Sequence, residues 1–105
     1  LEHAGYDKTP TDEALTSLKA SAVELLPELE GAPVVAHWAG LRPGSPEGIP
    51  YIGPVPGHDG LWLNCGHYRN GLVLAPASCQ LLANLLTGAE PIIDPAPYAP
   101  QGRLG

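Results

Sequence analysis

Two arginines lie in short motifs whose neighbours are small or turn-forming residues. Arg42 lies in the LRPG motif of residues 41–44, and Arg69 lies in the GHYRNG motif of residues 66–71. Each motif follows a segment that is predicted to be a strand, so glycine and proline fix the backbone and allow a ligand to approach closely. An arginine can bind a planar carboxylate through two parallel hydrogen bonds. The pair predicts a carboxylate-binding site, and the alternative is that both arginines are solvated turn residues.

Metal and thiol chemistry find little support in the spacing of the cysteines and histidines. Cys65, His67 and Cys79 do not form the pairs that bind zinc, with or without His58. A nucleophile built from Cys65 and His67 lacks a third group to orient the histidine. We therefore expect no metal site, and we expect both cysteines to be small packed side chains that stay reduced.

Hydrolase and phosphate-binding motifs are also absent from the sequence. Residues 44–48 read GSPEG, which does not have the G-x-S-x-G spacing of a serine hydrolase and contains a proline where the turn is needed. Gly53, Gly57 and Gly60 do not form G-x-G-x-x-G, and no helix is expected directly after them. Acyl transfer and nucleotide binding through a phosphate loop are thus not indicated.

The elements that must position the two arginines are predicted to be α+β, with a small antiparallel sheet beside two main helices. Thr9 or Thr11 can cap a first helix at about 11–26, and Gly31 closes that segment. Apolar residues recur along this helix at steps of three and four, which predicts one buried stripe. Those residues are Leu15, Leu18, Ala22, Leu25, Leu26 and Leu29. The strands are expected at about 33–41, 49–54 and 61–65.

The second helix is expected from about Pro76 to Thr87, with Gly88 as its stop. No carboxylate lies in its first turn, so its N-terminus offers partial positive charge and unpaired N–H groups. Such an end is a binding site for an anion or an electron-rich edge of a ligand. The tail from residue 89 contains four prolines and no periodicity, and is expected to wrap around the domain or fray.

Length, charge and composition restrict the class of protein. The chain has 105 residues, 13 glycines, 13 prolines, no methionine and a net charge of −6. An acidic chain argues against a nucleic-acid partner or an anionic membrane surface. The sequence contains no signal peptide pattern or long apolar span, which predicts a cytoplasmic protein. Three arginines, Arg42, Arg69 and Arg103, lie in a nearly neutral second part, so each of them needs a structural or functional reason.

The order of the motifs resembles the C-terminal part of the FAD-dependent D-amino-acid oxidase family. The likeness is carried by WAGLRPG at 38–44, PYIGP at 50–54 and GHYRNGLVLAP at 66–76, with EHAGYDKT at 2–9 preceding them. Within the family the likeness is greatest to the glycine oxidase branch, which is linked to thiamine thiazole synthesis. The resemblance implies an enzyme that oxidises a small amine or D-amino acid to the imine and releases hydrogen peroxide.

The resemblance also implies roles for individual residues. Arg42 corresponds to the arginine that binds the substrate carboxylate, and Arg69 to a second active-site arginine beside the flavin. The neighbours of Arg69 correspond to the loop that lies against the flavin ring: Gly66, His67, Asn70, Gly71 and Leu72. The second helix would direct its N-terminus at the flavin and stabilise negative charge there on reduction. No side chain is required as a strong base, because positioning and the cofactor supply most of the rate enhancement.

The resemblance covers the chain but not the FAD fingerprint or most of the FAD-binding domain of the family. We expect a single C-terminal fragment that joins part of the substrate domain, at about 1–60, to a flavin-facing strand, loop and helix at about 61–88. Residues 89–105 would form an irregular tail. Such a fragment is expected to lack FAD and activity, and its open sheet edge favours a homo-oligomer. The alternative is a stand-alone carboxylate-binding or interaction module without redox activity.

Overall fold

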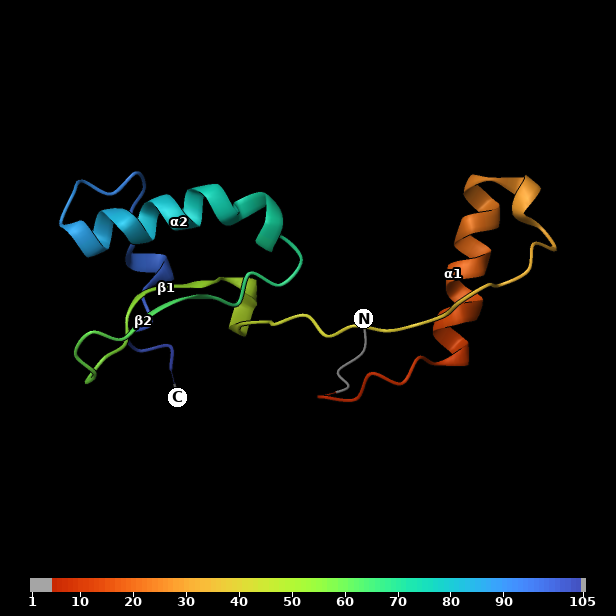
Figure 1. Cartoon of the computed structure of the whole chain (residues 1–105), viewed down its shortest axis with the longest axis horizontal. Coiled ribbons are helices and arrows are strands. Elements are labelled where there is room, and N and C mark those ends of the chain that lie inside the picture. The colour runs from red at the N-terminus through yellow and green to blue at the C-terminus, as the bar shows by residue number, and fades with distance from the viewer. Residues whose placement is uncertain (1–4, 105) are drawn as a thin grey trace. The chain divides into compact units, whose positions relative to one another are not determined.

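The computed structural model describes residues 5–104, which divide into two compact units. One unit ends at Leu41 and the other begins at Arg42 (Figure 1). The predicted α+β class is confirmed, since the described residues form two α-helices, three short 3-10 helices and one antiparallel strand pair. Both motifs that contain a candidate arginine lie in the second unit, apart from Leu41 at its border.

The first unit contains helix α1 (Asp12–Leu25) and a 3-10 turn η1 (Pro27–Leu29). Thr11 is the N-cap, and its hydroxyl accepts a hydrogen bond of 3.2 Å from the backbone N–H of Ala14. Two acidic residues in the first turn, Asp12 and Glu13, match the positive end of the helix. The helix predicted at about 11–26 is therefore confirmed.

The apolar stripe predicted to be buried on this helix is exposed instead. None of the residues of α1 is buried, and Leu18 and Leu25 are 63% and 86% exposed. Among the helices and strands of the described chain, α1 contacts only η1, which is too short to cover the stripe. An amphipathic face needs a second layer before it is removed from water, and this unit supplies none.

Residues 33–41 do not form the predicted strand. They have no regular secondary structure, and none of them takes part in a backbone hydrogen bond within the described chain. Val35 is 95% exposed and Trp38 is 78% exposed. The composition of this segment favours a strand, but a strand forms only where a neighbouring strand satisfies its N–H and C=O groups, and none does so within the described chain.

The second unit is built on a β-hairpin. Strands β1 (Tyr51–Pro54) and β2 (Trp62–Cys65) pair antiparallel, with Gly53 opposite Leu63. These bounds agree with the strands predicted at 49–54 and 61–65. The N–H of Val55 donates to the carbonyl of Leu61 at 2.9 Å and continues the pairing into the turn.

Helix α2 (Gly71–Thr87) packs against both strands, and together they form the small core of this unit (Figure 1). Leu81 is completely buried, Ser78 is 5% exposed, and Ile52 of β1 is 3% exposed. Gly88 ends the helix in the left-handed conformation, as predicted, with φ of 69°. Neither helix is long and apolar enough to cross a membrane within the described chain.

The start of α2 differs from the prediction, because the helix begins at Gly71 and not near Pro76. Asn70 is the N-cap, and its carbonyl accepts the N–H of Leu74 at 2.8 Å, which closes the first turn. Pro76 lies inside the helix and forgoes one backbone hydrogen bond. The prediction took this proline as a first-turn residue, whereas the helix tolerates it one turn later. The GHYRNG loop therefore leads directly into the helix N-terminus.

The C-terminal tail returns from α2 to the strand pair and is not frayed (Figure 1). A 3-10 turn η3 (Ala96–Tyr98) contacts β1, and Pro100 is fully buried. A Cβ atom on Gly53 would lie 3.2 Å from the Pro100 ring, so the glycine permits this close packing. Of the two outcomes expected for the tail, the structure shows that it wraps.

Candidate functional site

The two arginine motifs lie next to each other in the second unit. The N–H of Tyr68 donates to the carbonyl of Pro43 at 3.1 Å, so the residues that follow Arg42 and precede Arg69 are hydrogen-bonded. A Cβ atom on Gly44 would lie 3.9 Å from the Tyr68 ring, which is ordinary contact. The pairing of the motifs, inferred from their chemistry alone, is thus a feature of the fold.

Ser45, which directly follows the LRPG motif, forms a second hydrogen-bond contact with the GHYRNG motif. Its hydroxyl lies 2.6 Å from the carbonyl oxygen of Ile49 and 2.9 Å from that of Gly66, and it can donate to either. Gly66 is buried with φ of 80°, and a Cβ atom there would lie only 2.9 Å from the Cβ of Ser45. Only glycine fits at this crossing without a shift of the backbone.

The loop between β2 and α2 is a tight turn with a strained residue. The N–H of Asn70 donates to the carbonyl of His67 at 3.0 Å, and Tyr68 has a positive φ of 54°. A non-glycine residue in the left-handed region carries backbone strain, which is found where the surrounding structure fixes a functional loop. The guanidinium of Arg69 lies 5.5 Å from the centre of the Tyr68 ring.

Both candidate arginines present exposed side chains without an acidic partner. Among residues 5–104, Arg42 has no hydrogen bond or ion pair, and Arg69 has only its contact with the Tyr68 ring. Two neighbouring cationic motifs with no carboxylate to neutralise them favour binding of an external anion. The structure thus leaves both guanidinium groups available for the predicted ligand.

The remaining candidate residues line the start of α2. Asn70 caps the helix without a side-chain hydrogen bond, Gly71 is its first residue, and Leu72 is 90% exposed. The first turn contains no acidic residue. The Nε2 atom of His67 is buried and has no hydrogen-bond partner in the described chain. A buried polar atom without a partner is uncommon and indicates that a ligand or another part of the protein completes this loop.

Metal binding finds no geometric support in the described residues. Nowhere between residues 5 and 104 do three or more histidine, cysteine, aspartate or glutamate side chains gather as metal ligands. Cys65 and Cys79 are free and exposed, and the amide nitrogen of Asn64 lies 3.8 Å from the Cys79 sulfur. The expectation that these two cysteines are packed small side chains is therefore wrong, since each faces solvent.

Sequence reasoning did not predict the conformation or contacts of three residues in this part of the fold. Ser45 was considered only as part of a failed hydrolase motif, although a serine between glycine and proline is a common backbone-bonding residue. Tyr68 carried no signal for its positive φ, because such a conformation depends on the surrounding loop. Arg103 did carry one, since an arginine in a nearly neutral segment requires an explanation.

Comparisons with known proteins agree on one family. A family model described as FAD dependent oxidoreductase (DAO) matches residues 2–85. The chain is 91% identical over its whole length to glycine oxidase of Pseudomonas putida, and 82% identical over 99% of its length to glycine oxidase of Pseudomonas aeruginosa. It covers 29% of each of these proteins. The crystal structure of glycine oxidase from Geobacillus kaustophilus superposes with a TM-score of 0.79 at 36% identity, covering 95% of this chain and 27% of that one.

Proposed function

Since this chain belongs to the FAD-dependent oxidoreductase family, we propose that it is the C-terminal part of a flavin-dependent oxidase that acts on glycine or a similarly small amino acid. The observation that carries the proposal is the pair of adjacent arginine motifs without acidic partners, next to an acid-free helix N-terminus. The identity to proteins named glycine oxidase supports the choice of substrate. The chain spans less than a third of those proteins, so the proposal concerns the whole protein that contains it.

The residues at the start of α2 fit the edge of a flavin ring. In an α-helix the first N–H groups, here those of Gly71, Leu72 and Val73, have no acceptor within the helix. Leu72 and Val73 are 90% and 80% exposed, which gives an apolar surface beside these donors. The buried Nε2 of His67 without a partner lies in the same loop. A flat ligand with an electron-rich edge would satisfy the donors and cover the apolar side chains.

Residues 66–72 would hold this edge of the flavin in the whole protein. When bound, FAD accepts two electrons from the amine and passes them to dioxygen, which is released as hydrogen peroxide. The positive end of α2 favours negative charge close to Gly71 and Leu72. The backbone N–H groups can approach the ring only because Gly66 and Tyr68 form the turn before the helix.

Arg42 binds the substrate carboxylate in this proposal. Its planar guanidinium can donate two parallel hydrogen bonds, which fix both the position and the rotation of the substrate. Arg69, whose guanidinium lies 5.5 Å from the centre of the Tyr68 ring, adds a second positive charge in the neighbouring motif. The amine then loses two hydrogens, and water hydrolyses the resulting imine. The two arginines contribute by orientation and charge, and no side chain is assigned as a base.

Wider assignments concern the role, location and partners of the whole protein. We propose that it serves thiamine thiazole synthesis, as the resemblance to the glycine oxidase branch implies, and that it acts in the cytoplasm. A small amino acid is the expected partner, and neither nucleic acid nor membrane is expected because of the net charge of −6. The homo-oligomer expected from the open edges of β1 and β2 stays a prediction.

Anaerobic mixing of the FAD-loaded whole protein with glycine tests the proposal. We expect the visible absorbance of the flavin to bleach, and admission of air to restore it with release of one hydrogen peroxide per turnover. D-alanine serves as a second carboxylate-bearing substrate. The isolated chain of residues 1–105 is the matched control, and we expect it to carry no flavin absorbance and to release no peroxide.

Two outcomes would contradict the proposal in different ways. Binding of glycine without any bleaching would favour the alternative of a carboxylate-binding module without redox activity. Peroxide release by the isolated chain would show that residues outside it are not needed, and the assignment of these residues as part of a larger site would be lost.

A further inference from the structure

Arg103 holds the C-terminal tail against the segment that precedes β1. Its Nη2 donates to the carbonyl of Ile49 at 2.6 Å, and its Nη1 lies 3.0 Å from the carbonyl oxygen of Pro50 and 3.2 Å from that of Pro97. The guanidinium also stacks on the ring of Tyr51, 4.3 Å from its centre. Tyr51 returns a hydrogen bond of 3.0 Å from its hydroxyl to the carbonyl of Arg103. The tail therefore donates hydrogen bonds to this segment through Arg103 and accepts one from it through Tyr51.

The carbonyl of Ile49 connects this contact to the two arginine motifs. It faces both Arg103 Nη2 and the hydroxyl of Ser45, each at 2.6 Å. The same hydroxyl lies 2.9 Å from the carbonyl oxygen of Gly66, where the GHYRNG loop begins. The Gly66 Cα also approaches Tyr51, because a Cβ atom there would lie 3.7 Å from that ring. A continuous set of contacts thus runs from Arg103 to the loop that carries Arg69.

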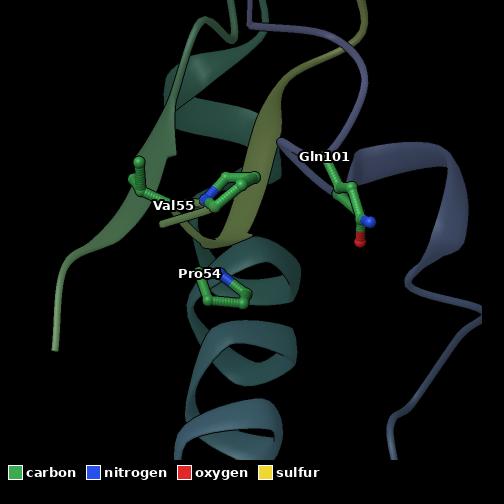
Figure 2. A pocket seen from close by; sticks show the side chains of 5 residues that line it. Pro54, Val55 and Gln101 are labelled. Carbon is green, nitrogen blue, oxygen red and sulfur yellow. The ribbon is translucent and has the colours of Figure 1, made fainter. Parts of the chain in front are cut away.

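Apart from Arg103, the tail contacts β1 through η3 and Pro100. A hollow of about 270 Å³ lies between residues at the end of β1 and residues of the tail, among them Pro54, Val55 and Gln101 (Figure 2). Pro100 packs on Gly53 farther along β1. Arg103 is the residue whose side chain reaches Ile49, Pro50 and Tyr51. Loss of its guanidinium would free the segment that Ser45 uses to fix the loop.

We infer that Arg103 is a positioning residue for the carboxylate site: from the tail, it fixes residues 45–51 and thereby the register between the Arg42 and Arg69 motifs. The inference rests on the proposed function for its effect on substrate. The family match ends at residue 85, so the tail that supplies this arginine lies outside it. Arg103 touches no substrate in this account, and it acts through Ile49, Ser45 and Tyr51.

Hydrogen exchange of the whole protein tests the structural half of the inference. In Arg103→Ala we expect the Tyr68 amide, which donates to Pro43, to exchange on the order of tenfold faster, because the guanidinium no longer holds the segment to which Ser45 joins the loop. Gln101→Ala is the matched control, since Gln101 is an exposed tail residue without a hydrogen bond in the described chain. In Gln101→Ala the Tyr68 amide should exchange at the rate of the parent protein.

Binding of glycolate, a carboxylate that carries no amine, tests the functional half. For FAD-loaded Arg103→Ala we expect the Kd of glycolate and the KM of glycine to rise by about tenfold, with kcat at saturating glycine within about threefold of the parent. A merely structural role would lower FAD occupancy and kcat together and would leave the KM unchanged. Arg103→Lys should recover little, because an ammonium cannot span three carbonyls and stack on a ring.

If Arg103→Ala does not fold, Tyr51→Phe is the variant that tests the inference. It removes only the 3.0 Å hydrogen bond to the Arg103 carbonyl and keeps the ring under the guanidinium, so a smaller change of the same kind is expected. An unchanged Tyr68 exchange rate in the folded variants would overturn the inference, as would faster exchange with an unchanged Kd for glycolate. Failure of the parent protein to bind glycolate would instead overturn the proposed function, and hydrogen exchange alone would then decide whether Arg103 fixes the loop.

Discussion

Replacing Arg42 with alanine in the FAD-loaded whole protein is expected to lower kcat/KM for glycine by about a hundred- to a thousandfold. Losing a bidentate, charge-assisted pair in a desolvated site costs about 3–4 kcal/mol, and each 1.4 kcal/mol is a factor of ten. Most of the loss should appear in KM and in the Kd for glycolate, because Arg42 binds the carboxylate before and during the reaction. Steady-state kinetics with glycine and equilibrium titration with glycolate measure both.

Three comparisons isolate the role of Arg42. Arg42→Lys keeps the charge but loses the planar fork, so an intermediate loss is expected. Lys19→Ala removes an exposed cation from α1, outside both motifs, and should leave kcat/KM unchanged. Ethylamine has no carboxylate, so the parent and Arg42→Ala should oxidise it at equal, low rates. An equal loss of activity toward ethylamine would show that Arg42 supports the fold or the flavin and not the carboxylate.

Gly66→Ala is expected to lower the free energy of unfolding by about 2–4 kcal/mol, the sum of a left-handed backbone penalty and an overpacked contact. The backbone penalty arises from the φ of 80°, and the contact is the 2.9 Å approach of the new Cβ to the Cβ of Ser45. Neither atom is at the end of a flexible side chain, so the backbone must shift. Urea unfolding of the whole protein, followed by circular dichroism and by flavin release, measures the loss.

Gly60 provides a matched control for this substitution. Its φ of 76° is similar, but a Cβ atom there would have no neighbour within 4 Å. Gly60→Ala should therefore show only the backbone penalty of about 1–2 kcal/mol. Ser45→Gly removes the colliding Cβ, so the combined Ser45→Gly and Gly66→Ala variant should lose less than the sum of the two single losses. Equal losses for Gly60→Ala and Gly66→Ala would show that the crossing with Ser45 is not tight.

Helix ends that depend on capping residues could be predicted from the local sequence. Thr11 caps α1, and Gly88 ends α2 in the left-handed conformation, as their residue types predict. Pro76 misled the prediction because a proline in the first turn and a proline one turn later give the same sequence pattern. The helix tolerates the lost hydrogen bond at Pro76 because its packing, which buries Leu81, offsets the cost.

Long-range contacts set the limit of what the sequence could predict. Whether residues 33–41 become a strand depends on a partner strand, and whether the apolar side of α1 is buried depends on a second layer. The chain covers 29% of the glycine oxidases of Pseudomonas putida and Pseudomonas aeruginosa. We propose that the remaining part of such a protein supplies both the partner strand and the layer over α1.

In the candidate site, too, local features could be predicted from the sequence and long-range contacts could not. The types and spacing of residues predicted that Arg42 and Arg69 belong together, and the hydrogen bond from Tyr68 to Pro43 brings their motifs into contact. The contacts of Ser45 and Arg103 join residues 21 and 54 positions apart, and no local pattern indicates them. Candidate ligand-binding side chains could thus be proposed from the sequence, whereas the side chains that hold their motifs together required the structure.

A crystal structure of the FAD-loaded whole protein with glycolate bound tests the central claim most directly. We expect the glycolate carboxylate to lie on the guanidinium of Arg42, with residues 66–72 against the flavin and the N-terminus of α2 directed at its ring. A carboxylate held by other residues, with Arg42 turned to solvent and the GHYRNG loop away from the flavin, would contradict it.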